Sequence, residues 1–258
     1  MKDINSYLTD LSNSLNISPE KKERIETSIS YLSKNLWGHF QSRLSEVTVI
    51  GSFDRETIIS NDPEADVDTI VVFKQKEVQP ETYLKQLREF CEKNYTRSEI
   101  YQDHPTIVVD MGHIKFEIVP SYFYSETTKR IPAPRSKEFR WISTSPIEFK
   151  KNLDQKNKNN NGLIKPIIKI LKHWNYLNGK EFSSYDIEKA VVNKSYSCSN
   201  LRDYYFYATN ALIDTAATDK QKKVCADLKE RNRRLRILEQ YKIPEYIETE
   251  LSTYLPFP

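Results

Sequence analysis

The feature that most constrains this chain is a pair of apolar runs that are separated by a polar loop and bounded by special residues. The first run, Val47–Ile50, ends at Gly51-Ser52, and the second, Thr69–Phe73, begins directly after Asp66-Val67-Asp68. Because side chains alternate across a strand, the two aspartates share one face and the valine between them takes the other. We therefore predict a strand, a Gly-Ser turn, a variable loop and a strand that begins with two carboxylates on one face.

Two carboxylates held side by side repel each other, which favours a cation between them. Oxygen ligands of this kind suit Mg²⁺ or Mn²⁺. A third acid, Glu117, lies in the segment His113–Pro120, whose apolar and charged residues alternate as in a strand. If this strand lies beside the strand of Asp66 and Asp68, the three carboxylates can reach the same metal ions. A bare acidic pair is commonly a solvated surface feature, but the upstream turn and the third acid favour the metal site.

Three carboxylates beside a phosphate-binding turn suit nucleotidyl transfer with two metal ions. One ion would activate an attacking hydroxyl, and the other would hold the triphosphate and stabilise the leaving pyrophosphate. A glycine lets backbone amides approach a phosphate closely, and a serine hydroxyl adds a hydrogen-bond donor. We therefore expect Gly51 and Ser52 to bind phosphate.

Two segments of the C-terminal half add candidate binding residues. Leu163–Leu177 has a broad apolar face at helical spacing and a basic stripe that includes Lys169 and Lys172. On spacing alone, such a stripe is a solvated helix face. A further helix is expected to open at Ser184-Tyr185, which on its own indicates a capping serine followed by a core tyrosine.

Together these motifs resemble the signature of the DNA polymerase β-like nucleotidyltransferase superfamily. Within it they are most similar to the bacterial cyclic-oligonucleotide synthases, relatives of cyclic GMP-AMP synthase and oligoadenylate synthase. The matching elements are Gly51-Ser52, Asp66-x-Asp68, Glu117 in FEIVP, Lys172 in KILKHWN, and Ser184 in SSYDIE. One departure is Glu56-Thr57, where relatives carry a glycine-threonine pair. The missing glycine implies a stiffer loop with a charge near the phosphate path.

The resemblance implies roles for the candidate residues. Asp66 and Asp68 would bridge two metal ions, and Glu117 would bind the catalytic ion and help to activate the hydroxyl. The triphosphate and the base would be bound by Gly51, Ser52, Lys169, Lys172, Ser184 and Tyr185. The expected substrates are nucleoside triphosphates such as ATP. The expected product is a cyclic or short linear oligonucleotide signal, sensed by a downstream effector in bacterial anti-phage defence.

The predicted fold class is α/β (α+β), with a polymerase β-like nucleotidyltransferase lobe built on a mixed sheet and a helical C-terminal lobe. Residues 1–145 would form the N-terminal helices and the catalytic lobe, and residues 146–258 the helical nucleotide-binding lobe. A long helix is expected over about 19–42, because a capping serine precedes a proline at its first position. The polar segment 150–161 is interpreted as a helix end and a solvated connection.

Composition excludes several other classes of protein. A hydrophobic share of 38% with 29% charged residues indicates a globular chain. No apolar run approaches the ~20 residues of a membrane span, and the N-terminus has no apolar signal core. The net charge of +3 does not indicate binding of duplex nucleic acid. Three widely spaced cysteines without CxxC spacing indicate reduced thiols in a cytoplasmic protein.

Several alternatives stay open. The chain could be a template-free or protein-primed polymerase that makes longer oligonucleotides, or a transferase that nucleotidylates a protein or a tRNA. Tyr254 in the C-terminal tail is a candidate primer by its position alone. Outside enzymes, the alternative is an inactive nucleotide-binding regulatory module, which three clustered carboxylates argue against. The base and sugar preference, the linkage, the trigger and the oligomeric state also stay open.

Overall fold

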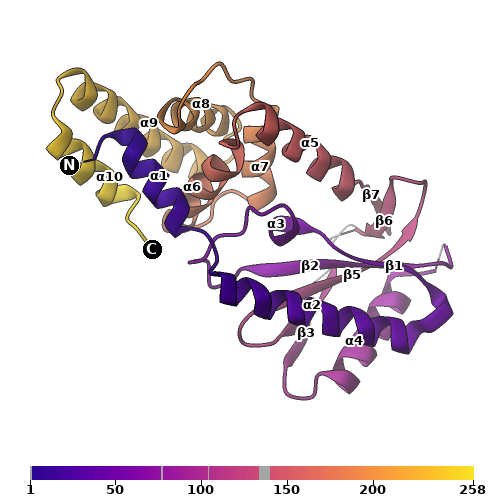
Figure 1. The fold of residues 1–258 in the computed structure, drawn as a ribbon. Coiled ribbons are helices and arrows are strands. Elements are labelled where there is room, and N and C mark those ends of the chain that lie inside the picture. Colours follow the sequence, from indigo (N-terminus) through magenta and orange to yellow (C-terminus); the bar gives the residue numbers. More distant parts are fainter. Residues whose placement is uncertain (1, 77, 104, 134–139) are drawn as a thin grey trace. The chain divides into compact units, whose positions relative to one another are not determined.

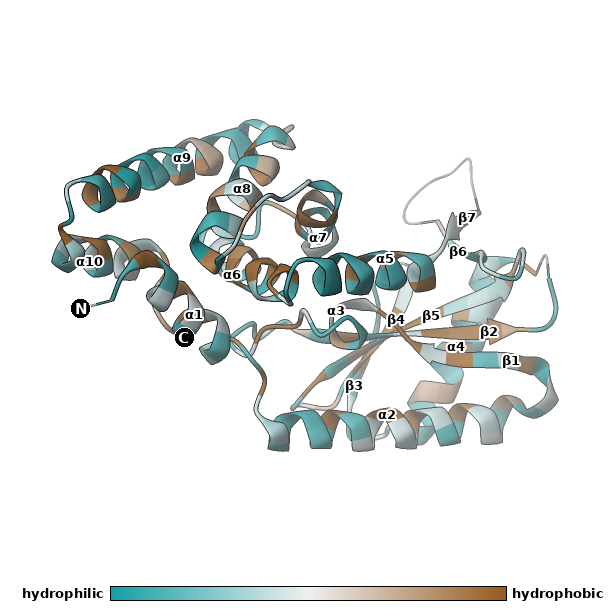
Figure 2. Ribbon diagram, turned by 45° about the horizontal axis from the view of Figure 1, so that its top comes forward, coloured by the Kyte–Doolittle hydropathy of each residue, from teal (hydrophilic) through white to brown (hydrophobic). Residues whose placement is uncertain are grey.

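The computed structural model describes the chain except for residues 1, 77, 104 and 134–139. The chain divides into two compact units. The sheet unit comprises Ser18–Glu56 and Glu64–Lys151, and the helical unit comprises Met1–Ile17, Thr57–Pro63 and Asn152–Pro258. Figure 1 labels most elements of both units, and β4 is labelled in Figure 2. Among the helices of the described residues, none has the length and the apolar character that a membrane span requires.

The sheet unit is built on one mixed sheet of seven strands in the described residues. The strand order is β1-β2-β5-β4-β3, with β6 paired to β5 and β7 paired to β6. The strands are β1 Leu44–Val49, β2 Asp66–Phe73, β3 Glu99–Asp103, β4 Thr106–Asp110, β5 Lys115–Phe123, β6 Lys129–Pro132 and β7 Trp141–Thr144. Only the β2–β5 pair is parallel in this sheet of described residues. The predicted mixed sheet is therefore confirmed.

Two helices, α2 (Pro19–Phe40) and α4 (Pro80–Asn94), lie along one face of the sheet (Figure 1). Their aromatic side chains meet the end of β2, because the Phe73 ring lies 5.2 Å from that of Phe40 and 4.1 Å from that of Tyr83, measured between centroids. Figure 2 shows that β2 carries mostly hydrophobic residues. Burial of these apolar side chains is the main force that holds the helices to the sheet.

The start of α2 confirms the capping prediction. Ser18 is the N-cap and its side chain accepts a hydrogen bond from the Lys21 amide, while Pro19 occupies the first helical position. The helix ends at Phe40, two residues before the predicted end, because Gln41 adopts φ 49°. A short 3₁₀ turn, Gln41–Arg43, then leads into β1.

The helical unit is formed by α1, by α5 from Asn152 onward and by the helices that follow α5. These are α1 Ile4–Ser14, α5 Pro146–Asn159, α6 Ile164–Leu177, α7 Ser184–Asn193, α8 Leu201–Asp214, α9 Asp219–Gln240 and α10 Pro244–Tyr254. Helix α6 packs against α1, α7 and α8. Its Trp174 is buried, so the broad apolar face predicted for this helix forms part of a core.

Two features of the helical unit differ from the sequence predictions. The polar segment after residue 150 is helical as far as Asn159, so that the connection to α6 is only residues 160–163. Helix α1 belongs to this unit although it precedes the sheet in the sequence. It packs on α6, α8 and α10, and its Leu8 and Leu11 side chains are buried. Thr57–Pro63 also belongs to it, so the two units are not simply residues 1–145 and 146–258.

Candidate functional site

The acidic residues of β2 and β5 lie on one face of the sheet. The two strands are parallel, with Asp66 opposite Lys115 and Asp68 opposite Glu117. Because residues opposite each other in paired strands point to the same side, Asp66, Asp68 and Glu117 share this face. The condition under which the three acids can reach the same metal ions, that the strand of Glu117 lies beside the strand of the two aspartates, is therefore met.

Electrostatics show that Glu117 lies in a strongly acidic environment. Burial disfavours its charged form and raises the pKa of Glu117, and the charges of Asp68 and Asp103 raise it further. A hydrogen bond with Asp66 and the charge of Lys115 act in the opposite direction. Repulsion of this kind between carboxylates is relieved when a cation binds between them.

The donor set fits a hard divalent cation by its chemistry, since all three side chains are carboxylates. The arrangement of these side chains fits a metal ion less completely. Among the residues that the structure describes, no group of three or more His, Cys, Asp or Glu side chains is arranged to hold a metal ion. The backbone therefore places the three acids on one face of neighbouring strands, but their side chains do not form a closed coordination shell.

The Gly-Ser turn lies directly against the second aspartate. It is the start of the short helix α3, Gly51–Asp54, and the Ile50 amide donates to the Asp68 carbonyl at 2.9 Å. Gly51 has φ +76°, and a Cβ atom built on it would lie 1.7 Å from Asp68 Oδ2. Glycine is therefore required here both by the left-handed backbone and by the close approach to the carboxylate. This packing places Ser52 at the acidic end of β2.

Helix α3 is also attached to the first turns of α5. The Lys150 Nζ atom donates to Asp54 Oδ1 at 2.6 Å, and the Arg55 guanidinium lies 5.4 Å from the centroid of the Phe149 ring. Arg55 is buried. These contacts hold the turn in place within the sheet unit, and no sequence motif pointed to Phe149 or Lys150.

Glu56 occupies the position at which the resemblance calls for a glycine. Its φ is 58°, in the left-handed region that L-residues other than glycine adopt at a cost. The departure noted in the sequence therefore has a conformational consequence. The backbone keeps the shape that a glycine would adopt easily, and a glutamate adopts it instead.

The two lysines of α6 lie in different environments. Lys172 is buried, and its Nζ atom donates to Glu188 Oε1 at 2.6 Å and to the carbonyl and hydroxyl oxygens of Thr57 at 3.2 Å each. Lys169 is more exposed, and its Nζ atom donates to Asn16 Oδ1 at 2.6 Å. Lys172 therefore does not lie on a solvated stripe, as spacing alone would suggest. Its partner Glu188 joins α7 to α6.

At the N-terminus of α7, the serine that caps the helix is not one of the two candidate binding residues. Ser183 is the N-cap, since its hydroxyl accepts from the Asp186 amide at 3.0 Å and donates to the Asp186 carboxylate at 2.7 Å. Ser184 is exposed and is not the capping residue. Tyr185 is 49% exposed and is not a core residue. Ser184 is therefore not the helix cap and Tyr185 is not a core residue, although the local sequence alone indicated these roles.

One segment of the site was not foreseen from the sequence. Thr57–Pro63, which we call the strap, leaves α3 through Glu56 and groups with the helical unit. The Ser60 amide donates to the Leu15 carbonyl at 2.9 Å, and Asn61 Nδ2 lies 3.0 Å from His173 Nδ1. The strap has no helix or strand periodicity, so a search for periodic patterns had no signal to detect.

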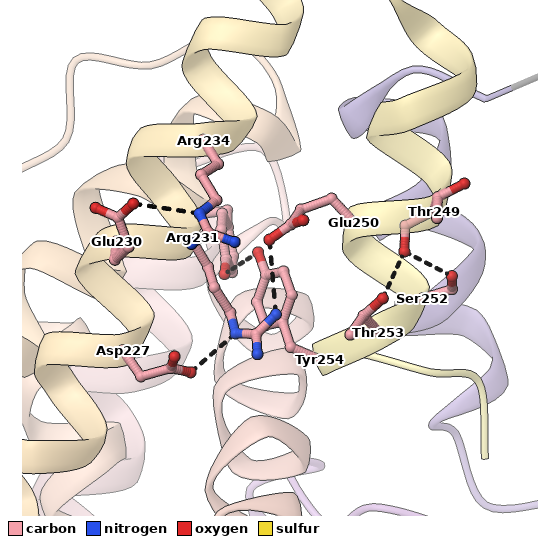
Figure 3. A network of polar contacts seen from close by, with 10 residues as sticks. Asp227, Glu230, Arg231, Arg234, Thr249, Glu250, Ser252, Thr253 and Tyr254 are labelled. Carbon is pink, nitrogen blue, oxygen red and sulfur yellow. Dashed lines mark hydrogen bonds and ion pairs between the residues drawn. The ribbon is translucent and has the colours of Figure 1, made fainter.

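Tyr254 is not the accessible primer that its position suggested. Its ring is buried, and its hydroxyl lies 3.0 Å from the Tyr205 hydroxyl. Burial raises the pKa of Tyr254 well above its usual value. Figure 3 shows Arg231 beside the Tyr254 ring, and the guanidinium lies 5.2 Å from the ring centroid. A hydroxyl enclosed in this way cannot act as a primer without local unfolding, so this hypothesis is corrected.

Solved structures share the fold of the whole chain. A structure of CdnC from Escherichia coli MS115-1 with ATP matches with a TM-score of 0.78, 13% identity and 98% coverage of both chains. CdnG from Bradyrhizobium diazoefficiens with GTP matches with a TM-score of 0.77 and 12% identity, covering 97% of this chain and 95% of that chain. Vibrio cholerae DncV, a cyclic AMP-GMP synthase, matches with a TM-score of 0.71 and 10% identity, covering 94% of this chain and 92% of that chain. No curated protein sequence matches the chain.

The sequence itself also matches a defined family. Residues 1–157 match the profile of the second messenger oligonucleotide or dinucleotide synthetase domain, a stretch that contains the Gly-Ser turn and all three acidic residues. The match covers more than half of the chain, and the expected resemblance to nucleotidyltransferases that make cyclic oligonucleotides is confirmed. The chain belongs to the second messenger oligonucleotide or dinucleotide synthetase family.

Proposed function

We propose that this protein is a metal-dependent nucleotidyltransferase that joins nucleoside triphosphates into a cyclic or short linear oligonucleotide and releases pyrophosphate. The observation that carries the proposal is the parallel pairing of β2 with β5, which sets Asp68 opposite Glu117. The close packing of Gly51 on Asp68 adds a turn of phosphate-binding type at the same place. Membership of the synthetase family supports the class of reaction.

In this proposal Asp66, Asp68 and Glu117 hold Mg²⁺ or Mn²⁺. The bound metal supplies Lewis-acid stabilisation of the reacting phosphoryl group and of the leaving pyrophosphate. The three side chains lie on one face of β2 and β5, so binding a common metal requires no change in strand register. Glu117 also helps to activate the attacking hydroxyl.

The remaining candidate residues bind the nucleotide in this proposal. Gly51 and Ser52 contact the triphosphate through backbone amides and a hydroxyl. The helical unit contributes Lys169, Lys172, Ser184 and Tyr185. The exposure of Ser184 at a helix N-terminus supports an anion-binding role, and the exposed ring of Tyr185 supports stacking on a base.

We place this activity in the bacterial cytoplasm, in anti-phage defence, with a downstream effector that senses the product. The three cysteines are free thiols, which supports a reducing compartment. The structures of family neighbours with ATP and with GTP support nucleoside triphosphates as substrates of this chain.

Product analysis tests the proposal. The full chain is incubated with Mg²⁺ or Mn²⁺ and each ribo- and deoxynucleoside triphosphate, singly and mixed, beside an Asp66→Asn/Asp68→Asn variant. Glu99→Gln is the matched control, because it removes an exposed carboxylate from the same sheet. We expect small discrete products and pyrophosphate from the wild type and the control, and neither from the double variant.

The other outcomes identify the rivals. Products that resist phosphatase indicate a cyclic molecule, whereas a ladder indicates a linear polymerase and label on a protein indicates nucleotidylation. Nucleotide that binds equally to wild type and to the Asp66→Asn/Asp68→Asn variant, without pyrophosphate release from either, would contradict the enzyme proposal and support a regulatory binding module.

A further inference from the structure

The strap is attached to the helical unit by a buried polar network. The Lys172 ammonium has three N–H donors, and three oxygen atoms accept from it, namely Glu188 Oε1, Thr57 O and Thr57 Oγ1. The Thr57 hydroxyl in turn donates to Glu188 Oε1 at 2.6 Å. Thr57 and Glu188 are both fully buried, and Lys172 is 6% exposed. A buried ion pair is stable only when hydrogen bonds satisfy its atoms in this way.

Further contacts hold the rest of the strap. Asn61 lies against His173, and Lys180 Nζ donates to Asp62 Oδ1 at 2.8 Å. His173 Nε2 lies 2.7 Å from the Pro256 carbonyl. Since that nitrogen must donate to the carbonyl, Nδ1 is left as the acceptor for Asn61. The strap is therefore fixed near both of its ends.

The ends of the strap continue directly into the candidate site. At its N-terminal end, Thr57 follows Glu56 and the Gly-Ser turn of α3. At its C-terminal end, Pro63 is three residues before Asp66, the first acid of β2. A displacement of the strap would therefore be transmitted through a few covalent bonds to both parts of the site.

We propose that Thr57 and Lys172 are positioning residues for the triphosphate. The proposal rests on the proposed nucleotidyltransferase function and specifies what Lys172 does in it. Lys172 fixes Thr57, and Thr57 anchors the chain just after the C-terminal end of α3, the short helix that begins with Gly51 and Ser52. The direct alternative, in which Lys172 only contacts phosphate, predicts that Thr57 is irrelevant to nucleotide affinity.

The hydroxyl of Thr57 provides a sharp test. Thr57→Val keeps the shape and removes one acceptor of Lys172 and one donor to Glu188. Thr57→Ser keeps the hydroxyl. Thr69→Val is the matched control, because Thr69 is equally buried in the sheet unit and its hydroxyl has no hydrogen-bond partner among the described residues. KM and kcat are measured by pyrophosphate release, and amide hydrogen exchange of residues 57–63 is measured by mass spectrometry.

We expect Thr57→Val to raise KM for the nucleoside triphosphate about tenfold, the scale of a lost hydrogen bond to a charged group. Its kcat should fall less, and exchange of the strap amides should increase. Thr57→Ser should restore KM to within about twofold of the wild type, and Thr69→Val should leave it there. Because both residues act through one network, Thr57→Val/Lys172→Met should be no worse than Lys172→Met alone.

The results that overturn the inference are distinct from those that overturn the proposed function. If the wild type releases pyrophosphate and Thr57→Val has a wild-type KM, Thr57 does not position the site. If the effects of Thr57→Val and Lys172→Met on KM multiply, the two residues act separately and the inference also fails. A wild type that binds nucleotide and never releases pyrophosphate overturns the proposed function instead, and hydrogen exchange then still reports whether the network holds the strap.

Discussion

Replacing Glu188 with glutamine should strongly destabilise the helical unit. Glu188 is fully buried, and its Oε1 atom accepts from both the Lys172 ammonium and the Thr57 hydroxyl. Glutamine has the same shape but no charge, so the buried ammonium loses its counter-ion. Removing one member of a buried pair costs about 3–5 kcal/mol. Because the glutamine oxygen can still accept a hydrogen bond, we expect about 3 kcal/mol.

A double-mutant cycle separates the pair from its surroundings. Lys172→Met alone leaves the Glu188 carboxylate buried and should cost about as much as Glu188→Gln, near 3–5 kcal/mol. Lys172→Met/Glu188→Gln closes the cycle with the two single variants, because it removes both charges at similar volume and leaves no unpaired charge buried. The two oxygens of Thr57 then lose their lysine, at about 1–3 kcal/mol. The loss in unfolding free energy of the double variant should therefore be smaller than the sum of the losses in the two single variants.

The assay is urea unfolding followed by the fluorescence of Trp174, which is buried in α6. Trp37 and Trp141 lie in the sheet unit, and they are replaced by phenylalanine in all proteins compared, so that the signal reports the helical unit. Glu230→Gln is the control, because Glu230 pairs with arginines on the exposed surface of α9. Its unfolding curve should match that of the parent.

Two results would refute this reasoning. A loss below about 1 kcal/mol for Glu188→Gln would mean that the lysine is solvated or finds another partner. Additive losses in the double variant would mean that Lys172 and Glu188 do not stabilise one another.

Three further predictions concern the loop, the pH response and the sheet. Glu56→Gly should raise the unfolding free energy by about 0.5–1 kcal/mol, because relief of the left-handed strain exceeds the entropy cost of glycine; thermal unfolding measures it, and Glu56→Ala should show no gain. Burial lowers the pKa of His173, so the neutral form is favoured in the fold. The stability that neutral His173 contributes is present above the unfolded pKa of about 6.5 and is lost as pH falls below it. When the pH is lowered from about 7.5 to about 5.5, the thermal midpoint of His173→Gln should therefore drop less than that of the wild type. Lys129→Met should cost about 2–3 kcal/mol, because Lys129 is buried with its Nζ atom 2.8 Å from Glu46 Oε1; urea unfolding should show the loss largely reversed in Lys129→Met/Glu46→Gln.

The first acidic pair and the helix starts could be predicted because they depend on residues close together in the chain. Two-residue alternation put Asp66 and Asp68 on one face, and the Ser18-Pro19 pair marked the start of α2. The sequence also indicated that Gly51 would let backbone amides approach a phosphate. Only the fold showed that a Cβ atom at this position would collide with Asp68. The local pattern thus indicated the residue types of the candidate site.

Other site features depend on partners that are distant in sequence. That Glu117 lies opposite Asp68 follows from parallel pairing of two strands about fifty residues apart, which the alternation in each strand permits but does not specify. Lys172 appeared to lie on a solvated stripe because helical spacing says nothing about the acid that folds over it. Tyr254 appeared accessible in the same way, until α8, α9 and α10 enclosed it.

By itself, the sequence determined where strands and helices begin, which side chains share a face, and which chemistry the acids and the turn can perform. The tertiary structure alone decided which strand lies beside β2, that α1 and the strap join the helical unit, and that Lys172 is paired with Glu188. The physical reason is the range of the forces involved. Backbone geometry and capping act over a few residues, whereas burial and ion pairing depend on which distant surfaces the folded chain brings together.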